Sequence, residues 1–499
     1  MKRFLLVVLL VFLPVQGASP LIEAIKTSDR ARIESLINKS DVNVAEADGM
    51  TALHWAALKG DAEAAIGLIK ANANVNATNR YGISPLALAC QSGSASIVEM
   101  LLKAGADPNS ELRGEETALM IAARTGDLEV VKALLKAGAE INAKEKRGQT
   151  AVMWAAAEGH AAIVEFLIES GADFKTPLDG GFTPLFFAVR EGRADVVKIL
   201  LKAGADVNET MQPKRRAGRG PQAGMTPLLM AVENGHFELA IDLVKAGADP
   251  NDQRAGYSAL HNITWVRKPN SGEDEDGMPP PAGSGSIDSL EFVRKIVALG
   301  ADLNARIPKA PGGRGVLNRT GATPFLMAAK TADIALLKLF YELGADPALT
   351  TSEGVTPLIA AAGIGTLAAG EVAGTEEEVL EVVDWLVQIG ADVNAVDKNG
   401  ETAMHAAAYK NLPKVVELLA AKGAKIDVWN QKNKYGWTPL LIAEGFRPGN
   451  FKPSFETIAS IHKVMLAAGV TPPPPTSNDG VNNSDFGPPD RKYPSKAAR

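Results

Sequence analysis

The stretch Thr51–Ala77 reads TALHWAALKGDAEAAIGLIKANANVNA, and its pattern returns from Thr117 as TALMIAARTGDLEVVKALLKAGAEINA and from Thr183 as TPLFFAVREGRADVVKILLKAGADVNE. A threonine is a good helix N-cap, because its hydroxyl accepts a hydrogen bond from a free N–H of the first turn. The proline after Thr183 suits the next position, where its missing N–H costs nothing. Each copy therefore predicts a short helix that begins directly after its threonine.

The second half of each copy predicts a second helix. In the segment 128–138, LEVVKALLKAG, the glycine Gly138 ends the apolar pattern and suits a left-handed C-cap. Extended residues of the type ADVN and a turn containing glycine then lead to the next threonine. Each copy is therefore predicted to be helix, turn, helix and loop. One face of this second helix is marked by apolar residues at helical spacing, namely Leu128, Val130, Val131, Leu134 and Leu135.

The copies recur along most of the chain. The opening Thr or Ser stands at 51, 84, 117, 150, 183, 226, 258, 323, 356, 402 and 438, and a worn copy opens at Ser19, which makes twelve. Helix openings such as TALHWAA, SALHNIT and TAMHAAA, together with the interval of 33 residues, resemble the ankyrin repeat family, whose helix opens T-P-L-H-x-A. The resemblance covers residues 19–469. Extra residues fall between the two helices of a copy or in the loop after it, where a solenoid tolerates insertions.

The resemblance implies an all-α fold, an α-solenoid of about twelve ankyrin repeats in which each unit packs only on its neighbours. We expect a signal peptide over 1–17, the solenoid over 18–470 and a disordered Pro-, Asn- and Ser-rich tail over 471–499. The resemblance also implies that the histidines of the T-x-L-H element are structural and bond the neighbouring loop. These histidines are His54, His261 and His405.

The first residues, MKRFLLVVLLVFLPVQGASP, are typical of a secretory signal, with a basic start, an apolar run and small residues near Gly17. A membrane anchor is the alternative, but the apolar run is short for a membrane span. We therefore expect an exported protein, periplasmic or secreted, without a membrane span after cleavage. The formal net charge of −6 becomes −8 once Lys2 and Arg3 are removed. The single cysteine, Cys90, excludes an intrachain disulfide and is expected in the core of a first helix.

No catalytic motif is present, and the chain is expected to be a binding protein without enzyme activity, cofactor or metal. The segment 363–368, GIGTLA, lacks the preceding strand of a dinucleotide site, and the segment 272–277, GEDEDG, lacks the ligand spacing of a calcium loop. An enzyme with a site built from the insertions at 265–287 or 363–378 is a weaker alternative, because neither insertion contains a paired nucleophile and base. The acidic charge and the expected export argue against nucleic acid.

The family resemblance implies that a partner binds the loop tips and the inner ends of the first helices. These positions are basic and aromatic in an acidic chain, and Arg and aromatic residues are favoured in interface hot spots. We predict a monomer that binds a protein with an acidic surface, either as a scaffold of the cell envelope or as a secreted effector or inhibitor acting on a target in another cell. The predicted contacts are Arg80, Tyr81, Arg113, Arg124, Arg147, Trp154, Phe182, Arg190, Lys214, Arg215, Arg216, Arg219 and Tyr257.

Further positions share the same repeat phase and are expected on the same surface. On the first helices, Trp55, Trp154 and Phe187 share a phase for which packing in the core is the favoured role, and they are the best candidates of that phase to reach a ligand. Lys330 and Lys410 lie near first-helix ends. The residue before the opening Thr or Ser is expected in the exposed loop row. It is Met50, Ile83, Phe182, Met225, Tyr257, Val355 or Trp437.

Overall fold

The computed structural model describes residues 19–214, 223–269, 281–310, 317–367, 372–447 and 452–474. The chain divides into two compact units, Met1–Ala205 and Asp206–Arg499, here called unit 1 and unit 2. Apart from two isolated bridges, Ala45 to Thr51 and Glu111 to Thr117, the described residues form helices and loops and no strand. The all-α prediction is confirmed, and so is the number of twelve helix pairs, six in each unit.

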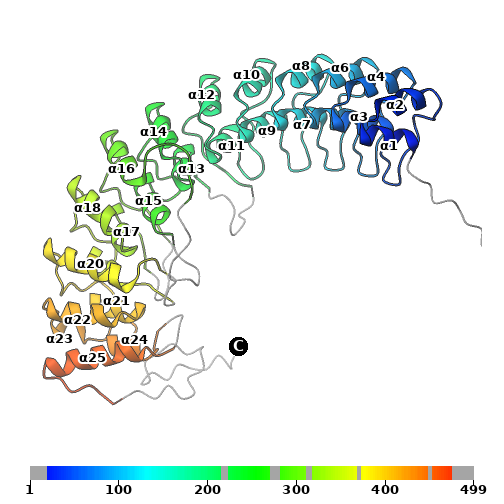
Figure 1. Cartoon of the computed structure of the whole chain (residues 1–499). Coiled ribbons are helices and arrows are strands. Elements are labelled where there is room, and N and C mark those ends of the chain that lie inside the picture. Colours follow the sequence, from blue (N-terminus) through cyan, green and yellow to red (C-terminus); the bar gives the residue numbers. More distant parts are fainter. Residues whose placement is uncertain are drawn as a thin grey trace, which may run out of the picture. The chain divides into compact units, whose positions relative to one another are not determined.

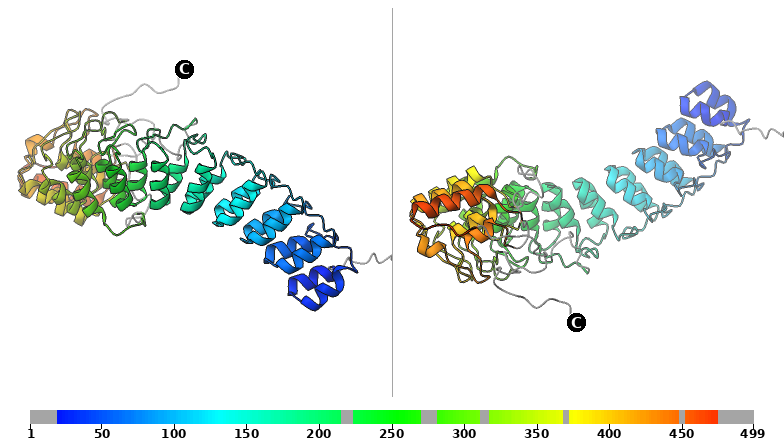
Figure 2. Two further views of the ribbon diagram at one scale, coloured as in Figure 1. Left: turned by 90° about the horizontal axis from the view of Figure 1, so that it is seen from above. Right: turned by 90° about the horizontal axis from the view of Figure 1, so that it is seen from below.

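Unit 1 is built from two layers of short helices, and the pairs follow one another along the unit (Figures 1 and 2). Each first helix packs on the first helix of the next pair, and each second helix does the same in its own layer. The first helices are α1 (Pro20–Thr27), α3 (Ala52–Lys59), α5 (Pro85–Gln91), α7 (Ala118–Thr125), α9 (Ala151–Glu158) and α11 (Pro184–Arg190). The second helices are α2 (Arg30–Ile37), α4 (Ala62–Lys70), α6 (Ala95–Lys103), α8 (Leu128–Lys136), α10 (Ala161–Glu169) and α12 (Ala194–Lys202).

Unit 2 has the same two layers, with longer connections and a four-residue helix, α23 (Ile426–Trp429), in one loop. The first helices are α13 (Pro227–Glu233), α15 (Ala259–Arg267), α17 (Pro324–Lys330), α19 (Pro357–Ala362), α21 (Ala403–Lys410) and α24 (Pro439–Ala443). The second helices are α14 (Phe237–Lys245), α16 (Ser289–Ala298), α18 (Ile334–Glu342), α20 (Glu376–Gln388), α22 (Pro413–Ala421) and α25 (Phe455–Ala467).

The helix ends are set by local chemistry, as the sequence indicates. The side chain of Thr183 accepts a hydrogen bond from the N–H of Phe186, which begins α11, and Asp127 caps α8 in the same way. Gly138 follows α8 with a φ of 90°. This left-handed conformation is easy for glycine and ends the helix.

Burial between the layers stabilises helices that are too short to persist alone. In α8 the side chains of Val130, Val131 and Leu134 are fully buried, whereas Leu128 and Leu135 are half-buried at the margin of the predicted face. Each of these helices packs on the helices of the preceding and following pairs, so the stability of one pair depends on its neighbours.

The loops between pairs are joined by a ladder of asparagines. The side-chain amide of Asn76 donates to the carbonyl of Gly105 over 2.9 Å, and its oxygen accepts the N–H of Asp107 over 2.9 Å. The asparagine of the GAD-x-N element therefore forms hydrogen bonds with backbone groups in the loop of the following pair. The same two bonds are made by Asn43, Asn109, Asn142, Asn208, Asn251 and Asn394.

The T-x-L-H histidines also bridge neighbouring pairs. Their Nε2 atoms lie 3.0 Å from the carbonyl oxygen of Ile83, 3.1 Å from that of Ala322 and 3.1 Å from that of Gln431, for His54, His261 and His405 in turn. Each acceptor belongs to the loop that precedes the next first helix. The structural role that the family resemblance implied for these histidines is confirmed.

The insertion after residue 209 leaves the helices intact. Its described ends are joined by two backbone bonds of 2.9 Å, from Met211 N–H to the carbonyl of Met225 and from Gly224 N–H to the carbonyl of Met211. Met211 is fully buried at this base. The two ends of the insertion are therefore held together by backbone hydrogen bonds where they join the repeat.

Candidate functional site

We call the loops between helix pairs, residues 41–50, 74–83, 107–116, 140–149 and 173–182, the loop edge of unit 1. At its tips Tyr81 is exposed over 46% of its surface. The guanidinium of Arg80 lies 4.8 Å from the Tyr81 ring centroid and donates to the hydroxyl over 2.6 Å. Arg113, from the next loop, lies 5.9 Å from the same ring. Two cations from neighbouring repeats thus share one exposed aromatic ring.

Two similar pairs stand where the first helices adjoin the loop edge. Arg124 lies 5.3 Å from the ring of Trp154 and forms an ion pair of 3.2 Å with Glu116. Arg190 lies 5.3 Å from the rings of both Phe182 and Phe187. Stacking restricts the guanidinium groups, so less rotamer freedom is lost when a ligand binds them.

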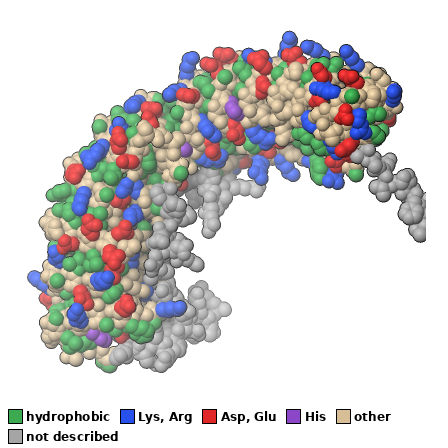
Figure 3. Space-filling model, in the orientation of Figure 1, with side chains coloured by type: hydrophobic (Ala, Val, Ile, Leu, Met, Phe, Trp, Pro, Cys, Tyr) green, Lys and Arg blue, Asp and Glu red, His purple; other side chains and the backbone are tan. Residues whose placement is uncertain are grey.

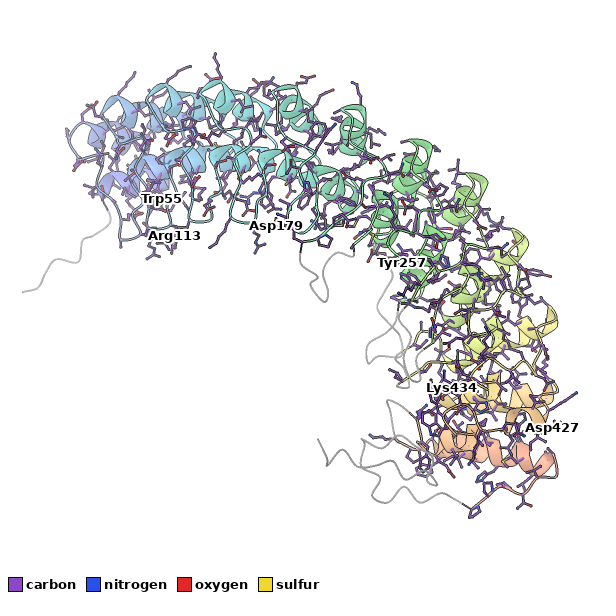
Figure 4. The ribbon with its side chains drawn as sticks, turned by 180° about the vertical axis from the view of Figure 1, so that it is seen from behind. Trp55, Arg113, Asp179, Tyr257, Asp427 and Lys434 are labelled. Atoms are coloured by element: carbon purple, nitrogen blue, oxygen red, sulfur yellow. The ribbon has the colours of Figure 1, made fainter. Side chains whose placement is uncertain are left out.

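Trp55 carries a fourth arrangement of this kind at the start of unit 1. Lys26 lies 4.5 Å from its ring, and its indole N–H donates to Glu46 over 2.8 Å. Figure 3 shows Lys and Arg side chains recurring along this side of unit 1 among hydrophobic ones, and Figure 4 shows Arg113 and Asp179 projecting from the loops. The surface is therefore mixed in charge but richly supplied with fixed cations and aromatic rings.

The structure brings some of the predicted contacts together and separates others. Arg147 is exposed and makes no ion pair or ring contact within the described residues, and Lys214 is exposed in unit 2. Tyr257 also lies in unit 2, packed edge to face on Trp265 with ring centroids 5.1 Å apart. Three predicted contacts, Arg215, Arg216 and Arg219, lie outside the described residues.

Several positions expected in the exposed row are core positions instead. The residue before the opening threonine turns under the next loop, so Met50, Met225, Val355 and Trp437 are buried. The predictions for these four residues were wrong because repeat phase alone does not distinguish the outside of a turn from its inside. Phe187, on α11, is 6% exposed, which agrees with the packing role that was favoured for its phase.

Lys410 is a second correction, since the expected surface cation is only 5% exposed. Its ammonium donates to the carbonyl of Ala373 over 2.9 Å, in the longer connection between α19 and α20. Burial chiefly, and then the charge of Lys330, lower the pKa of Lys410 to about 7. The connection that covers this lysine is an insertion, whose path the repeat pattern does not predict.

A buried acid, Glu401, was missed by the sequence analysis. It precedes Thr402, the position that is apolar in many repeats, and it is 3% exposed. Its carboxylate accepts from Tyr409 Oη over 3.1 Å and from Asn433 Nδ2 over 2.8 Å. Burial, and then the charge of Asp397, raise the pKa of Glu401 to about 8. An acidic residue at a position that is usually apolar was the available signal.

Unit 2 also contains an open groove of about 730 Å³, which we call the insertion groove. The sequence analysis predicted Tyr257 as a partner contact but did not single out Trp265 or Lys309. These residues lie in or beside the longer connections of unit 2, where repeat phase is lost. Figure 4 shows Tyr257 on the loop side of unit 2. The groove is lined by Glu233, Ala255, Gly256, Tyr257, Trp265, Pro269, Ile307, Lys309, Ala310, Leu317, Arg319, Met327, Lys330, Thr331, Gly365, Leu367 and Val372.

The described residues hold no group of three or more His, Cys, Asp or Glu side chains placed to bind a metal ion. Among the helices described above, none is long and apolar enough to cross a membrane.

Stacked helix pairs with asparagine-linked loops define a helical repeat protein. The chain belongs to the ankyrin repeat family: the family model for ankyrin repeats in three copies matches residues 21–112, 119–211 and 371–450, and the single-repeat model matches 223–255. The probable 26S proteasome regulatory subunit p28 of Saccharomyces cerevisiae is 29% identical over 177 residues, which are 35% of this chain and 68% of that protein.

Two further similarities are more limited in extent. An ankyrin repeat and KH domain-containing protein of Caenorhabditis briggsae is 34% identical over 167 residues, or 30% of this chain but only 6% of that protein. The crystal structure of the human ASB11 ankyrin repeat domain is similar with a TM-score of 0.40 and 28% identity, covering 47% of this chain and all (100%) of that one.

Proposed function

We propose that this protein is a non-catalytic scaffold of the cell envelope that binds an acidic protein surface through the loop edge of unit 1 and the adjoining first helices. Ankyrin repeats generally mediate protein–protein interaction and are typically non-catalytic. The observation that carries the proposal is the cluster of Arg80, Tyr81 and Arg113, in which two repeats hold their cations on one exposed ring.

The chemistry of this cluster suits a carboxylate-bearing surface. A guanidinium donates to a carboxylate through two parallel N–H groups, and an exposed aromatic ring offers apolar area with little loss of side-chain freedom. Arg190 extends the same chemistry along the unit on Phe182. An acidic partner would gain most from these stacked groups, because they are already ordered before it binds.

We expect the triple change Arg80→Gln, Arg113→Gln and Arg190→Gln to weaken capture of the partner about tenfold, since three charge-assisted contacts are lost. A matched control is Lys103→Gln, Lys136→Gln and Lys202→Gln, which removes the same charge at exposed ends of the second helices. Quantitative pull-down from envelope extract at low and high salt measures the effect. Circular dichroism checks that both variants remain folded.

The two variants separate a located surface from general charge attraction. Proteins captured by the native chain and the control, but not by the arginine variant, should have acidic surfaces and bind less tightly at high salt. If both variants capture the same proteins equally well, the partner does not bind the loop edge of unit 1.

Export is part of the same proposal and rests on the basic start, apolar run and small residues that end near Gly17. The native protein, purified from the organism that makes it, is expected to lack about its first 17 residues. Intact-mass measurement checks this, and a terminus that begins at Met1 contradicts it. Fractionation of the same culture separates an envelope scaffold from an effector released into the medium.

A further inference from the structure

The insertion groove is a feature of this chain's longer connections and is separate from the loop edge of unit 1. Its walls come from α13, α15 and α17, from residues on either side of 311–316, and from residues that follow α19. Its volume of about 730 Å³ is within the usual range for ligand sites, and the groove is open to solvent. Because it is open, an extended segment of a protein can enter it and leave it again.

Four hydrogen-bond donors face this space without a partner of their own. Arg319 lies 5.9 Å from the ring of Trp265, and within the part of the chain that the structure describes neither Arg319 nor Lys309 makes an ion pair. The indole N–H of Trp265 and the hydroxyl of Tyr257 make no hydrogen bond to any described residue. Burial, and then Glu233, raise the pKa of Tyr257, so its hydroxyl keeps its proton. A ligand rich in acceptors matches this set.

The charges around the groove point to the same chemistry. Among the described residues that line it, Lys309, Arg319 and Lys330 are cationic and Glu233 is acidic. Burial first, and then the charge of Lys330, lower the pKa of the nearby Lys410, so positive charge is concentrated beside the groove. Carboxylates would form charge-assisted hydrogen bonds with Lys309 and Arg319.

The walls between the cations are apolar. Pro269 and Leu367 line the groove with the ring of Trp265, and all three are half-buried, whereas Ile307, Leu317, Met327 and Val372 in the same lining are buried. A ligand that carried only charge would leave the half-buried apolar groups in contact with water. The occupant must therefore combine carboxylates with apolar or aromatic side chains.

We propose that the insertion groove binds an extended segment of a partner protein in which acidic residues stand next to an apolar or aromatic residue. The backbone of such a segment supplies further acceptors for Trp265 and Tyr257. This inference rests on the proposed function as a protein-binding scaffold and adds a second contact to it, built on different residues.

The test is to select peptides on the purified full-length protein from a random dodecapeptide phage library, with an Arg319→Gln, Lys309→Gln double variant as counter-selection. Enriched peptides are then synthesised with a fluorescein label and titrated by fluorescence anisotropy. We expect acidic residues beside an aromatic or apolar residue in the peptides that require the groove. We also expect at least about tenfold weaker binding to the double variant and after Asp/Glu→Asn/Gln changes in the peptide.

Two controls make the result specific to the groove. Lys202→Gln with Lys245→Gln removes the same charge from exposed second-helix ends and should leave the affinity unchanged. The triple arginine variant of unit 1 should also bind the peptides normally. Loss of partner capture in that variant with no groove peptide selected would overturn this inference and leave the proposed function standing. If the same variant still captures the partner and groove peptides are selected, the proposed function of the loop edge would be overturned and this inference would stand.

Three results contradict the inference directly: no enrichment over the double variant, enriched peptides without acidic residues, or affinities that do not change when the acidic residues are replaced. Because Arg319 and Lys309 are exchanged for glutamine at the surface of the groove, folding is expected to survive. Thermal melts of the double variant check this before the selection.

Discussion

Replacing Gly224 by alanine is expected to lower the free energy of unfolding of unit 2 by at least about 3 kcal/mol. Gly224 has a φ of 86°, and a Cβ atom there would lie 2.1 Å from the carbonyl oxygen of Arg254. The obstacle is backbone of the next loop, which cannot move without breaking the Arg254–Ala255 turn and the bond from Gly224 N–H to Met211. Urea titration followed by circular dichroism measures the change.

Gly204→Ala is the matched control for this prediction. Gly204 has a φ of 92°, and the nearest atom to a new Cβ is the flexible end of Lys175, at 3.6 Å. Only the left-handed backbone is then strained, at a cost of about 1 kcal/mol. Equal losses in the two variants would show that close approach between the loops of unit 2 is not what requires glycine at 224.

His405→Leu is expected to cost about 2–3 kcal/mol at neutral pH, because the carbonyl of Gln431 and the N–H of Thr402 lose a buried partner. Leucine is a natural replacement in this chain, since Leu229 and Leu326 occupy the same phase of their repeats. The nearby buried Trp429 and Trp437 report unfolding of this region by fluorescence during a urea titration.

The same variant should lose part of the acid sensitivity of the native protein. Burial lowers the pKa of His405 to about 4 from its ordinary value of 6.5. The unfolded chain therefore binds a proton between pH 6.5 and 4 that the folded chain does not, and stability falls as the pH drops through this window. The effect amounts to about 3 kcal/mol at most, and the leucine variant should lack it. Curves of native and variant protein that fall in parallel would contradict this.

Glu401→Gln, in the same repeat, provides a control of opposite sign. The pKa of Glu401 is raised to about 8, so the folded chain holds a proton that the unfolded chain releases above its ordinary value of 4.5. The stability that this carboxyl contributes is present at low pH and lost as the pH rises towards 8. Relative to the native protein, the glutamine variant should therefore gain stability as the pH is raised from 6.5 to 8, whereas the histidine variant should gain as it is lowered.

Part of the surface could be predicted because repeat phase places it. Arg80, Tyr81 and Arg113 come just before the turn glycines Gly82 and Gly114, and their exposure depends on local loop geometry. Met50 and Trp437 were misplaced because they lie on the inner side of the same turn. Exposure in a tight turn changes from one residue to the next. An uncertainty of a single residue in the repeat alignment is therefore enough to place a buried side chain on the surface.

The sequence by itself determined the helix pairs, their number, their caps and the bridging histidines. Each of these depends on residues within one repeat or on the next copy of the same repeat, as with Thr183 and Phe186 or His54 and Ile83. Contacts of that kind recur from repeat to repeat, so the pattern that encodes them can be recognised in a single chain.

Only the tertiary structure decided where the insertions run. The burial of Lys410 under Ala373 and the insertion groove around Trp265 and Arg319 both depend on connections that occur once. No period links the residues that meet there, and their contacts are set by packing across several repeats. The physical reason is that residues within one repeat determine how it packs on the next repeat. The path of an inserted loop instead depends on which of its own side chains are buried and which hydrogen bonds it makes.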